Sequence, residues 1–441
     1  MDVYLTRGKR PAHSAVAILS CLVLVVATSI AAEPIDPSEP YRVREVDGCV
    51  NVRPQPNVDS TALACLGSGA EVVVIATEPY WREITLSDGR QGWIAKKFIE
   101  PSSTPEVAAT SVPILANAFL DVHFVDVGQG DAIWIHTFDD GIDGNGRFEG
   151  YNVVIDGGPY SSDARNPLLP YLEARGHHGA VIDALIVTHP HTDHFRGAET
   201  ISRHFDVRHY YDPGYPSSLV SYSGFLEAMR GVGDNPRRAE VLHIGASEFG
   251  QLNWGSELTV EALYAYDEHL DAMGSGNTLI NNASIVLRIE YGEHVFLLMG
   301  DAEGKDRDDL PDPPQYVEAR LLETAPARLK ATVLKIGHHG SETSSTVDFI
   351  RAVDPEIVVV QSGRKSFGGT YLPDATTLRR YCDHDPAVQI YRTDQNDALD
   401  RLSESEAADG DHIVIRSNGA GTPIVEAFEG GEPFQGGGCG G

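Results

Sequence analysis

The chain has 441 residues, and 41% of them are hydrophobic, so it is long enough to form two or three domains with substantial cores. Its formal net charge is −30, and no run of Lys or Arg occurs beyond the N-terminus. A broad basic surface for binding polyanions is therefore not expected, although a local basic patch at a site is compatible with the composition. We interpret the acidity as the self-repelling surface of a soluble extracellular protein.

The first 32 residues have the pattern of a signal peptide. Basic residues lie within positions 7–10, residues 15–27 are apolar, and residues 29–31 give a small-x-small cleavage pattern. We expect cleavage near Ala31 or Ala32 and export to the periplasm or the extracellular space. An uncleaved anchor is the alternative, but the apolar run is short for a bilayer span. No other segment of membrane length follows, so stable membrane insertion after cleavage is not expected.

Residues 41–101 alternate apolar and polar positions with period two, as short strands do. The segments NVRPQP, LACLGSGAEVVVI and WREITLSDGRQGWIAKKFI follow one another, and this arrangement resembles a bacterial SH3-type domain. The resemblance implies a small all-β barrel that tethers exported enzymes to the cell wall, so a cell-wall peptide is an expected partner. Residues 102–118 are rich in Pro, Ser and Ala without periodicity and predict a linker.

Cleavage of the signal peptide would remove Cys21 and leave four cysteines, an even number that permits disulfides in an exported chain. Cys49 and Cys65 lie in the same small domain, so we expect them to pair. A bond between Cys382 and Cys439 is a weaker expectation, because Cys439 lies in the Gly-rich tail, residues 429–441, whose composition predicts disorder.

Residues 182–194, IDALIVTHPHTDH, hold the strongest signal for chemistry. Residues 182–187 predict a buried strand, and residues 195–205 predict an amphipathic helix. Four potential metal ligands lie between them: His189, His191, Asp193 and His194. Imidazole nitrogens and a carboxylate suit zinc, manganese or iron. A polar loop with scattered histidines is the alternative, but this spacing favours a metal site at the carboxyl end of a strand.

Two further strands end in polar clusters. Residues 284–301 predict a hairpin that ends at Asp301, and residues 331–341 predict a strand that ends in a His-His-Gly-Ser turn. Three such strand ends in one chain indicate that their side chains meet at one sheet edge. Helices are predicted over residues 166–175 and 315–329. Residues 206–280 alternate weak strands and loops, which could cover the site or be a surface embellishment.

Together, these motifs resemble hydrolases of the metallo-β-lactamase fold. HPHTDH has the H-x-H-x-D-H signature, and FVDVGQGDA, VVIDGG, NNAS, LLMGD and VLKIGHHGS resemble the hydrolase domain of the competence protein ComEC and its free-standing relatives. The resemblance covers roughly residues 119–418. It implies an α+β fold in which a four-layer αβ/βα sandwich, residues 119–428, follows the small all-β SH3-like barrel. It also implies a binuclear metal centre.

The resemblance implies a role for each residue at a motif position. The implied ligands are His189 and His191 for one metal ion, Asp193, His194 and His339 for the second, and Asp301 as a bridge between them. His338 competes with His339 for its assignment, and Asp156 and Asn282 would support the ligands. Asp131, next to the GQG turn, is more consistent with a structural role. We expect two divalent ions, with zinc as the first expectation and manganese as the alternative.

Two positions depart from the family pattern. Many members have a further histidine before the Gly-Asp strand, but this chain has residues 281–284, NNAS, so the first metal ion would be weakly held or completed by water. Relatives carry Gly-His-Pro beyond the final strand, but this chain has residues 371–373, YLP. A β-lactamase is not favoured, because Asp301 stands where those enzymes commonly use cysteine.

A centre of this kind predicts a metal-dependent phosphodiesterase that uses a metal-bound hydroxide. Two cations lower the pKa of bound water toward about 7 and hold an anionic substrate in line for displacement. Asp193 would orient the nucleophile, and His338 and Ser341 would stabilise the developing charge. The expected substrate is a small or polymeric phosphodiester. The alternatives are a DNA or RNA nuclease of the ComEC type, which the net charge disfavours, and an inactive protein that binds the cell wall.

Overall fold

A computed structural model describes residues 41–44, 48–57, 60–78, 81–86, 89–101, 118–140, 142, 148–175, 181–229, 240–243, 251–252, 254–266, 273–363, 365–367, 369–395, 410–429, 431–434 and 437–439. The predicted signal peptide and residues 102–117 of the predicted linker lie outside these residues. Within the described part of the chain, no helix is both long enough and apolar enough to cross a bilayer.

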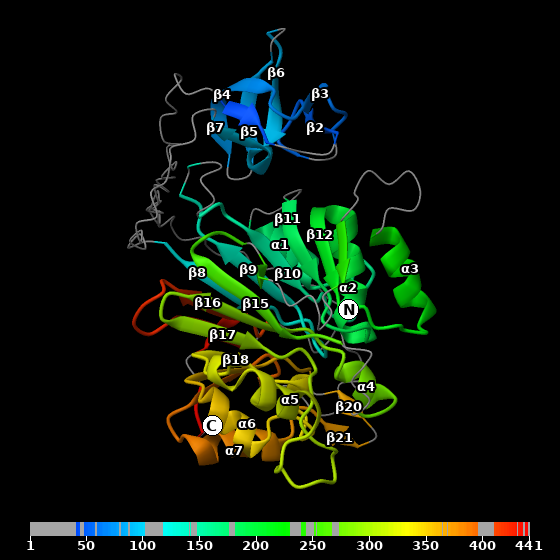
Figure 1. Ribbon diagram of the computed structural model, residues 1–441, viewed down its shortest axis with the longest axis vertical. Helices are drawn as coiled ribbons and strands as arrows, with labels where there is room; N and C mark the ends of the chain where they lie inside the picture. Colours follow the sequence, from blue (N-terminus) through cyan, green and yellow to red (C-terminus); the bar gives the residue numbers. More distant parts are fainter. Residues whose placement is uncertain are drawn as a thin grey trace, which may run out of the picture. The chain divides into compact units, whose positions relative to one another are not determined.

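Residues 41–101 form an all-β region, as the period-two pattern predicts. Its strands are β1 Tyr41–Val43, β2 Cys49–Val52, β3 Ala64–Gly67, β4 Glu71–Glu78, β5 Trp81–Thr85, β6 Gln91–Ala95 and β7 Ile99–Pro101. One sheet has the order β6-β5-β4-β1-β7, and β2 and β3 form a separate pair (Figure 1). Cys49 of β2 is disulfide-bonded to Cys65 of β3, which confirms the expected pairing. The SH3-type resemblance of this region stays a prediction.

The rest of the described chain forms two large sheets. The first has the order β13-β12-β11-β10-β9-β8-β23-β24-β25. Its strands are β8 Leu120–Phe124, β9 Ile133–Thr137, β10 Asn152–Ile155, β11 Val181–Ile186, β12 Asp206–Asp212, β13 Glu240–His243, β23 Ile413–Ser417, β24 Ile424–Glu429 and β25 Glu432–Phe434. Strands β10 to β13 are parallel, so the residues that follow β10 and β11 lie at the same edge.

The second sheet has the order β14-β15-β16-β17-β18-β19-β22. Its strands are β14 Gln251–Leu252, β15 Leu258–Tyr264, β16 Val286–Tyr291, β17 His294–Leu298, β18 Val333–Lys335, β19 Ile357–Val360 and β22 Gln389–Arg392. The predicted hairpin is confirmed, because β16 and β17 pair antiparallel with Tyr291 opposite His294. Strands β17, β18 and β19 are parallel, so the residues after β17 and β18 also share one edge.

Helices cover the outer face of each sheet and complete four layers (Figure 1). The helices are α1 Leu168–Ala174, α2 Thr192–His204, α3 Val220–Met229, α4 Asn277–Asn281, α5 Tyr316–Thr324, α6 Val347–Val353 and α7 Ala375–His384. Leu172, Phe195 and Phe225 bring α1, α2 and α3 onto the first sheet. Leu321, Phe349 and Tyr381 bring α5, α6 and α7 onto the second. A third core, which includes Val122, Leu287 and Val359, fills the space between the sheets. The predicted four-layer αβ/βα sandwich is confirmed.

Helix boundaries differ from the sequence expectation in two places. Helix α2 begins at Thr192 rather than at residue 195, which places Asp193 and His194 in its first turn. Helix α5 ends at Thr324, because Pro326 cannot continue its hydrogen-bond pattern and opens a separate 3₁₀ turn, Pro326–Arg328. The first difference matters for the site, because a helix fixes the two ligand side chains relative to each other.

Two segments are more ordered than the sequence pattern indicates. Residues 206–280 contain α3, whose buried Tyr222, Phe225 and Met229 have helical spacing that the alternation of weak strands does not reveal. The expectation of an unstructured tail is wrong for its described residues. Residues 432–434 form β25 and pair with β24, and Cys439 is disulfide-bonded to Cys382.

His412, directly before β23, makes the stability of the sandwich sensitive to acid. Its Nδ1 accepts the backbone N–H of Asp126 at 3.0 Å, and its ring centroid lies 4.4 Å from that of Tyr171. Burial, aided by the Arg175 guanidinium, lowers the pKa of His412 from its usual 6.5 to about 4. Between these two values the unfolded chain binds a proton that the folded chain excludes, so folding stability falls as the pH falls.

We expect His412 to contribute a loss of at most roughly 3 kcal/mol as the pH drops from about 6.5 to about 4. Urea unfolding of the parent and of His412→Gln, in which the amide oxygen can still accept the Asp126 N–H, measures this contribution. The difference in unfolding free energy between the two proteins should change across this pH window. A difference that is constant with pH would contradict the assignment.

Candidate metal centre

Buried strands bring the predicted ligand cluster to the carboxyl edge of the first sheet. All six residues of β11 are buried. Beyond its end, the backbone N–H of Thr188 donates to Asp156 Oδ1 at 2.8 Å, and the Thr188 hydroxyl donates to Asp156 Oδ2 at 2.7 Å. Asp156 follows the neighbouring strand β10, so these bonds fix the direction in which the chain enters the ligand cluster.

Glycines in two motifs allow α2 to pack closely against the loops around it. A Cβ atom at Gly197 in α2 would lie 1.6 Å from the carbonyl oxygen of Gly157, which belongs to the VVIDGG motif. A Cβ atom at Gly130, in the GQG turn, would lie 2.3 Å from the Asp193 carbonyl oxygen. Any side chain at either position would push away the first turn of α2. The two motifs therefore hold Asp193 and His194 in place.

Asp301 lies among three imidazoles. Its Oδ2 is 3.6 Å from His189 Nε2, 3.3 Å from His194 Nε2 and 3.4 Å from His339 Nε2. The three histidines and Asp301 are all buried. Two ligand atoms that are each about 2.1 Å from a tetrahedral zinc ion lie roughly 3.4 Å apart. The separations around Asp301 are therefore those expected of atoms that share a cation.

The remaining predicted ligands lie at the margin of this group. Asp193 Oδ2 is 3.6 Å from His339 Nε2, and His191 Nδ1 is 3.0 Å from His189 Nε2. Ligand atoms of Asp193, His194 and His339 lie within 4.8 Å of one another, as do those of His189, His194 and Asp301. The structure thus brings five of the six predicted ligands into such groups, and His191 adjoins them through its contact with His189. Their division between two metal ions stays a prediction.

Several polar atoms in this group lack a partner that the protein itself supplies. His194 Nε2, His339 Nε2 and Asp301 Oδ1 are buried and have no hydrogen-bond partner among the described residues. A buried polar atom without a partner costs free energy unless something else binds it. Two imidazole nitrogens and a carboxylate oxygen that face one another form a donor set that suits zinc or manganese. The residues present therefore fit a divalent metal centre.

The far nitrogen of each buried imidazole is held by the protein, as is usual for metal-binding histidines. His194 Nδ1 lies 2.8 Å from Asp156 Oδ2, which is the kind of contact that the predicted supporting role of Asp156 requires. His339 Nδ1 lies 2.9 Å from the carbonyl oxygen of Gln361. His189 Nδ1 lies 3.1 Å from the Thr188 hydroxyl. These contacts turn the near nitrogen, Nε2, of each ring toward Asp301.

Strong electrostatic coupling links the imidazoles and the carboxylates of this group. Burial favours the neutral imidazole, but the carboxylates of Asp301 and Asp156 raise the pKa of His194 well above its usual value. The carboxylates of Asp301 and Asp131 likewise raise the pKa of the buried His339. Burial would raise the pKa of Asp301, yet the surrounding imidazoles lower it well below its usual range. A buried carboxylate that holds its charge in this way attracts a cation.

The backbone is strained at three of these positions. Asp156, His338 and His339 have φ angles of 57°, 45° and 52°, in the left-handed region that non-glycine residues rarely adopt. Such conformations cost of order 1–3 kcal/mol each and cluster at functional sites. In the His-His-Gly-Ser turn, this conformation lets adjacent histidines point in different directions.

His339 and His338 therefore have different surroundings. His339 faces Asp301, whereas His338 Nδ1 lies 2.9 Å from Glu303 Oε1 and 3.0 Å from the Thr343 hydroxyl. His338 belongs to none of the groups of potential ligands among the described residues. The geometry favours His339 as the metal ligand. His338 lies in the wall of the cleft, where a bound substrate could contact it, as its predicted catalytic role requires.

Residues 281–284, NNAS, support the site although they lack the histidine of the family pattern. The side chain of Asn282 is fully buried, and its Oδ1 accepts the Glu303 N–H at 2.9 Å while its amide donates to the Met273 carbonyl at 3.1 Å. This contact holds the loop after Asp301, and the supporting role of Asn282 toward the metal ligands stays a prediction. Asn281 instead lies at the cleft, where its amide donates to Glu303 Oε1 at 2.8 Å.

Asp131 and Lys335 form an ion pair beneath the ligands. This pair was not predicted from the sequence. Both side chains are almost completely buried, and the Lys335 ammonium contacts Asp131 Oδ2 and donates to the Gly300 carbonyl at 3.0 Å. Asp131 Oδ1 lies 3.3 Å from His339 Nδ1. A lone lysine within the apolar strand VLKIG was the available signal, because a charge there needs a buried partner.

A cleft of about 470 Å³ opens onto the centre. His191, Asp193, Asp301 and His339 lie in its wall, with Ser341 beside them. The lining also includes residues of α4 and of the small hairpin formed by β20, Ser366–Phe367, and β21, Thr370–Tyr371. A ligand in the cleft would therefore contact the predicted metal ligands and the predicted catalytic Ser341 at the same time.

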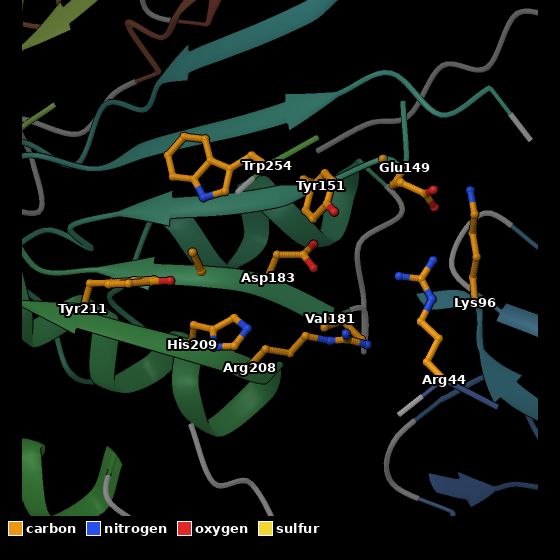
Figure 2. A pocket seen from close by; sticks show the side chains of 12 residues that line it. Arg44, Lys96, Glu149, Tyr151, Val181, Asp183, Arg208, His209, Tyr211 and Trp254 are labelled. Atoms are coloured by element: carbon orange, nitrogen blue, oxygen red, sulfur yellow. The ribbon is translucent and has the colours of Figure 1, made fainter. Parts of the chain in front are cut away.

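Figure 2 shows a different cavity, which contains none of the predicted ligands. Val181, Asp183 and His209 line it, from the strands β11 and β12. Val181 is the first residue of β11, whereas the ligand cluster follows the last residue of that strand. The carboxylate of Asp183 accepts the backbone N–H of Asn152 at 2.9 Å, which gives it a structural role. We assign no chemistry to this cavity.

Comparison with known proteins agrees with the fold. Residues 147–276 match the Metallo-beta-lactamase superfamily. ComE operon protein 3 of Bacillus subtilis is 27% identical over 295 residues, which are 63% of this chain and 32% of that protein. Recombination protein 2 of Haemophilus influenzae is 27% identical over 249 residues, which are 55% of this chain and 24% of that protein.

Among solved structures, a metallo-β-lactamase from Hirschia baltica is 16% identical, with 54% of this chain and 93% of that chain covered. The TM-score of this match is 0.29. The chain spans about a third or less of the length of the two curated relatives, so the activities of those whole proteins are not thereby established for it.

The fold, the buried His/Asp cluster and the superfamily match define a metallo-β-lactamase domain, the framework of a metal-dependent hydrolase. More particularly, the chain is similar to ComE operon protein 3, to Recombination protein 2 and to Competence protein ComA of Neisseria gonorrhoeae, which is 33% identical over 120 residues, 27% of this chain and 15% of that protein. These similarities are consistent with the predicted ComEC-like branch.

Proposed function

We propose that this chain is a phosphodiesterase that works with two divalent metal ions, with zinc as the expected metal and manganese as the alternative. The observation that carries the proposal is the position of Asp301, whose buried carboxylate lies 3.3–3.6 Å from three imidazole nitrogens at the wall of an open cleft. A carboxylate in this place has two oxygens with which to serve two cations. When bound, such ions supply positive charge that polarises a phosphoryl oxygen and acidifies water.

The chain's own residues would then position the reactants. Asp193 lies in the cleft wall at the start of α2, where its carboxylate could hold the proton of an attacking water. Ser341 presents a hydroxyl on the same wall and could donate to a phosphate oxygen as negative charge develops. His338, fixed by Glu303 and Thr343, lies beside it and would help to stabilise the same charge.

A substrate panel tests the proposal. Purified protein, with and without chelator, is assayed on bis(p-nitrophenyl) phosphate, on single- and double-stranded DNA, on RNA and on a chromogenic β-lactam. We expect chelator-sensitive turnover of the phosphodiester. Activity confined to nucleic acids would favour the nuclease alternative, which the ComEC resemblance implies and the charge of −30 disfavours. No turnover of any substrate by metal-loaded protein would favour the inactive wall-binding alternative.

His191→Ala should lower phosphodiester turnover by at least about 100-fold and leave the fold intact, because a ligand is lost while the buried strands beneath it are untouched. The matched control is His384→Ala in the last turn of α7, where the imidazole contacts Asp354 at 3.1 Å outside the cleft. This control should retain parental turnover. Circular dichroism checks the fold of both variants. Full turnover by His191→Ala would remove that residue from the centre.

We further propose that the chain is exported and associates with cell-wall peptide through its all-β region. The two disulfides, Cys49–Cys65 and Cys382–Cys439, support export, since such bonds persist mainly in oxidising compartments. The peptide partner rests on the SH3-type resemblance alone. Sedimentation of the protein with purified cell wall, with and without residues 41–101, would test it.

A further inference from the structure

Arg307 lies in the loop between β17 and α5 and forms part of the cleft wall together with Ser341. Its Nη2 donates to the Ser341 hydroxyl at 3.1 Å and to Asp374 Oδ2 at 2.9 Å, and its Nη1 donates to Asp374 Oδ1 at 3.3 Å. Arg307 has no role in the proposed hydrolysis, which uses Asp193, Ser341 and His338. Its guanidinium nevertheless donates a hydrogen bond to Ser341, which is proposed to take part in catalysis.

The contacts of Arg307 fix its position without using all of its donors. A guanidinium has five N–H groups in a rigid plane, and the three hydrogen bonds to described residues leave two of them available. The side chain is 39% exposed, so these groups can reach a molecule in the cleft. Arg307 is thus pre-positioned, and binding a ligand would freeze little additional motion.

Asp374 anchors this arrangement to the loop that carries the proposed ligand His339. Its Oδ2 also accepts the backbone N–H of Glu342 at 2.8 Å, and its own N–H donates to the Gly340 carbonyl at 3.0 Å. Asp374 directly precedes α7, so the carboxylate has a rigid support. The guanidinium is therefore held at a fixed place relative to the metal centre.

The charge of the cleft indicates what Arg307 would bind. Asp193, Asp301 and Glu303 contribute carboxylates to the cleft wall. The arginine and the lysine among its described lining residues are Arg307 and Lys365. The carboxylates contact imidazoles, whereas the positively charged Arg307 is 39% exposed in the cleft wall. The paired edge of the Arg307 guanidinium is held by Asp374, and its remaining N–H groups, on Nε and Nη1, can each donate a charge-assisted hydrogen bond to a phosphate oxygen.

We propose that Arg307, with the Ser341 hydroxyl, forms an anion subsite that binds a non-bridging oxygen of the substrate phosphate. The subsite rests on the proposed phosphodiesterase function and specifies it, because it would select a phosphate anion over a neutral ester or amide. Arg307 would act in substrate binding, so its loss should raise KM more than it lowers kcat.

Isothermal titration with inorganic phosphate tests the subsite without requiring turnover. Arg307→Gln should bind phosphate at least about tenfold more weakly than the parent, in both metal-loaded and metal-stripped protein. Arg307→Lys keeps the charge but loses the planar fork, so it should bind with intermediate affinity. The matched control is Arg320→Gln on α5, whose guanidinium pairs with Glu323 at the surface and lies outside the cleft. Its phosphate affinity should equal that of the parent.

Metal content and circular dichroism show whether each variant keeps its centre and its fold. Parental phosphate affinity in folded Arg307→Gln would overturn the subsite. If Arg307→Gln does not fold, parental affinity in Arg307→Lys would overturn it as well, because the fork would then be unnecessary. Loss of phosphate binding in a protein that hydrolyses no phosphodiester would instead support the subsite and refute the proposed function. The two failures are therefore distinguishable.

Discussion

Asp301→Ala should lose at least one metal ion per chain relative to a parent that binds up to two. The physical reason is that Asp301 Oδ2 lies within 3.6 Å of His189, His194 and His339, so its removal takes a ligand from every cation placed among them. Hydrolysis of a phosphodiester should fall with the metal content, by at least about 100-fold. Inductively coupled plasma mass spectrometry of the purified proteins measures the stoichiometry.

The matched control for this variant is Asp309→Ala. Asp309 lies in the same loop, is exposed, and accepts a hydrogen bond from Gln315 at 2.7 Å outside the cleft. Its replacement should leave metal content and turnover at parental values. A second variant, Asp301→Asn, keeps the size of the side chain and removes only its charge, so it separates ligand loss from a packing defect. Unchanged stoichiometry in both Asp301 variants would remove this residue from the centre.

Local sequence signals were sufficient for most of the fold and for the ligand cluster. The apolar runs before His189, Asp301 and His339 predict buried strands, and polar clusters at strand ends predict a shared edge, because parallel strands bring their carboxyl ends together. Those inferences depend on residues that are close in sequence. The same signals fail for α3, where the surrounding loops obscure a helical spacing of aromatic residues.

The support of the site could not be read from the sequence, because it depends on contacts between distant segments. The Gln361 carbonyl that holds the His339 ring is a backbone group and has no signature in the residue type. The choice between His338 and His339 depends on a left-handed turn that directs adjacent rings apart. The partner of Lys335 lies 204 positions away in the sequence, at Asp131. Each of these features needs the tertiary structure.

That ion pair gives the second large prediction, a loss of stability. Lys335 and Asp131 are 0% and 1% exposed in their side chains, and removing one member of such a pair leaves an uncompensated buried charge. Asp131→Asn should therefore lower the free energy of unfolding of the sandwich by about 3–5 kcal/mol. Urea unfolding is measured in chelator, because bound metal would add its own stabilisation to the folded state.

The two members of the pair should not be equivalent. Lys335→Met leaves Asp131 beside two further partners, since His339 Nδ1 lies 3.3 Å and His194 Nδ1 lies 4.0 Å from its carboxylate. Asp131→Asn leaves the Lys335 ammonium with the neutral carbonyl of Gly300. We therefore expect Asp131→Asn to be the more destabilising change. The double variant should recover part of the loss, because neither charge then remains buried.

Lys330→Met is the matched control, because it also removes one lysine from an ion pair. Lys330 and Asp354 are 77% and 51% exposed, so water already solvates both charges and the loss should be below about 1 kcal/mol. If Asp131→Asn costs no more than this control, the buried pair does not stabilise the sandwich. If Lys335→Met costs more than Asp131→Asn, the neighbouring imidazoles do not compensate the carboxylate.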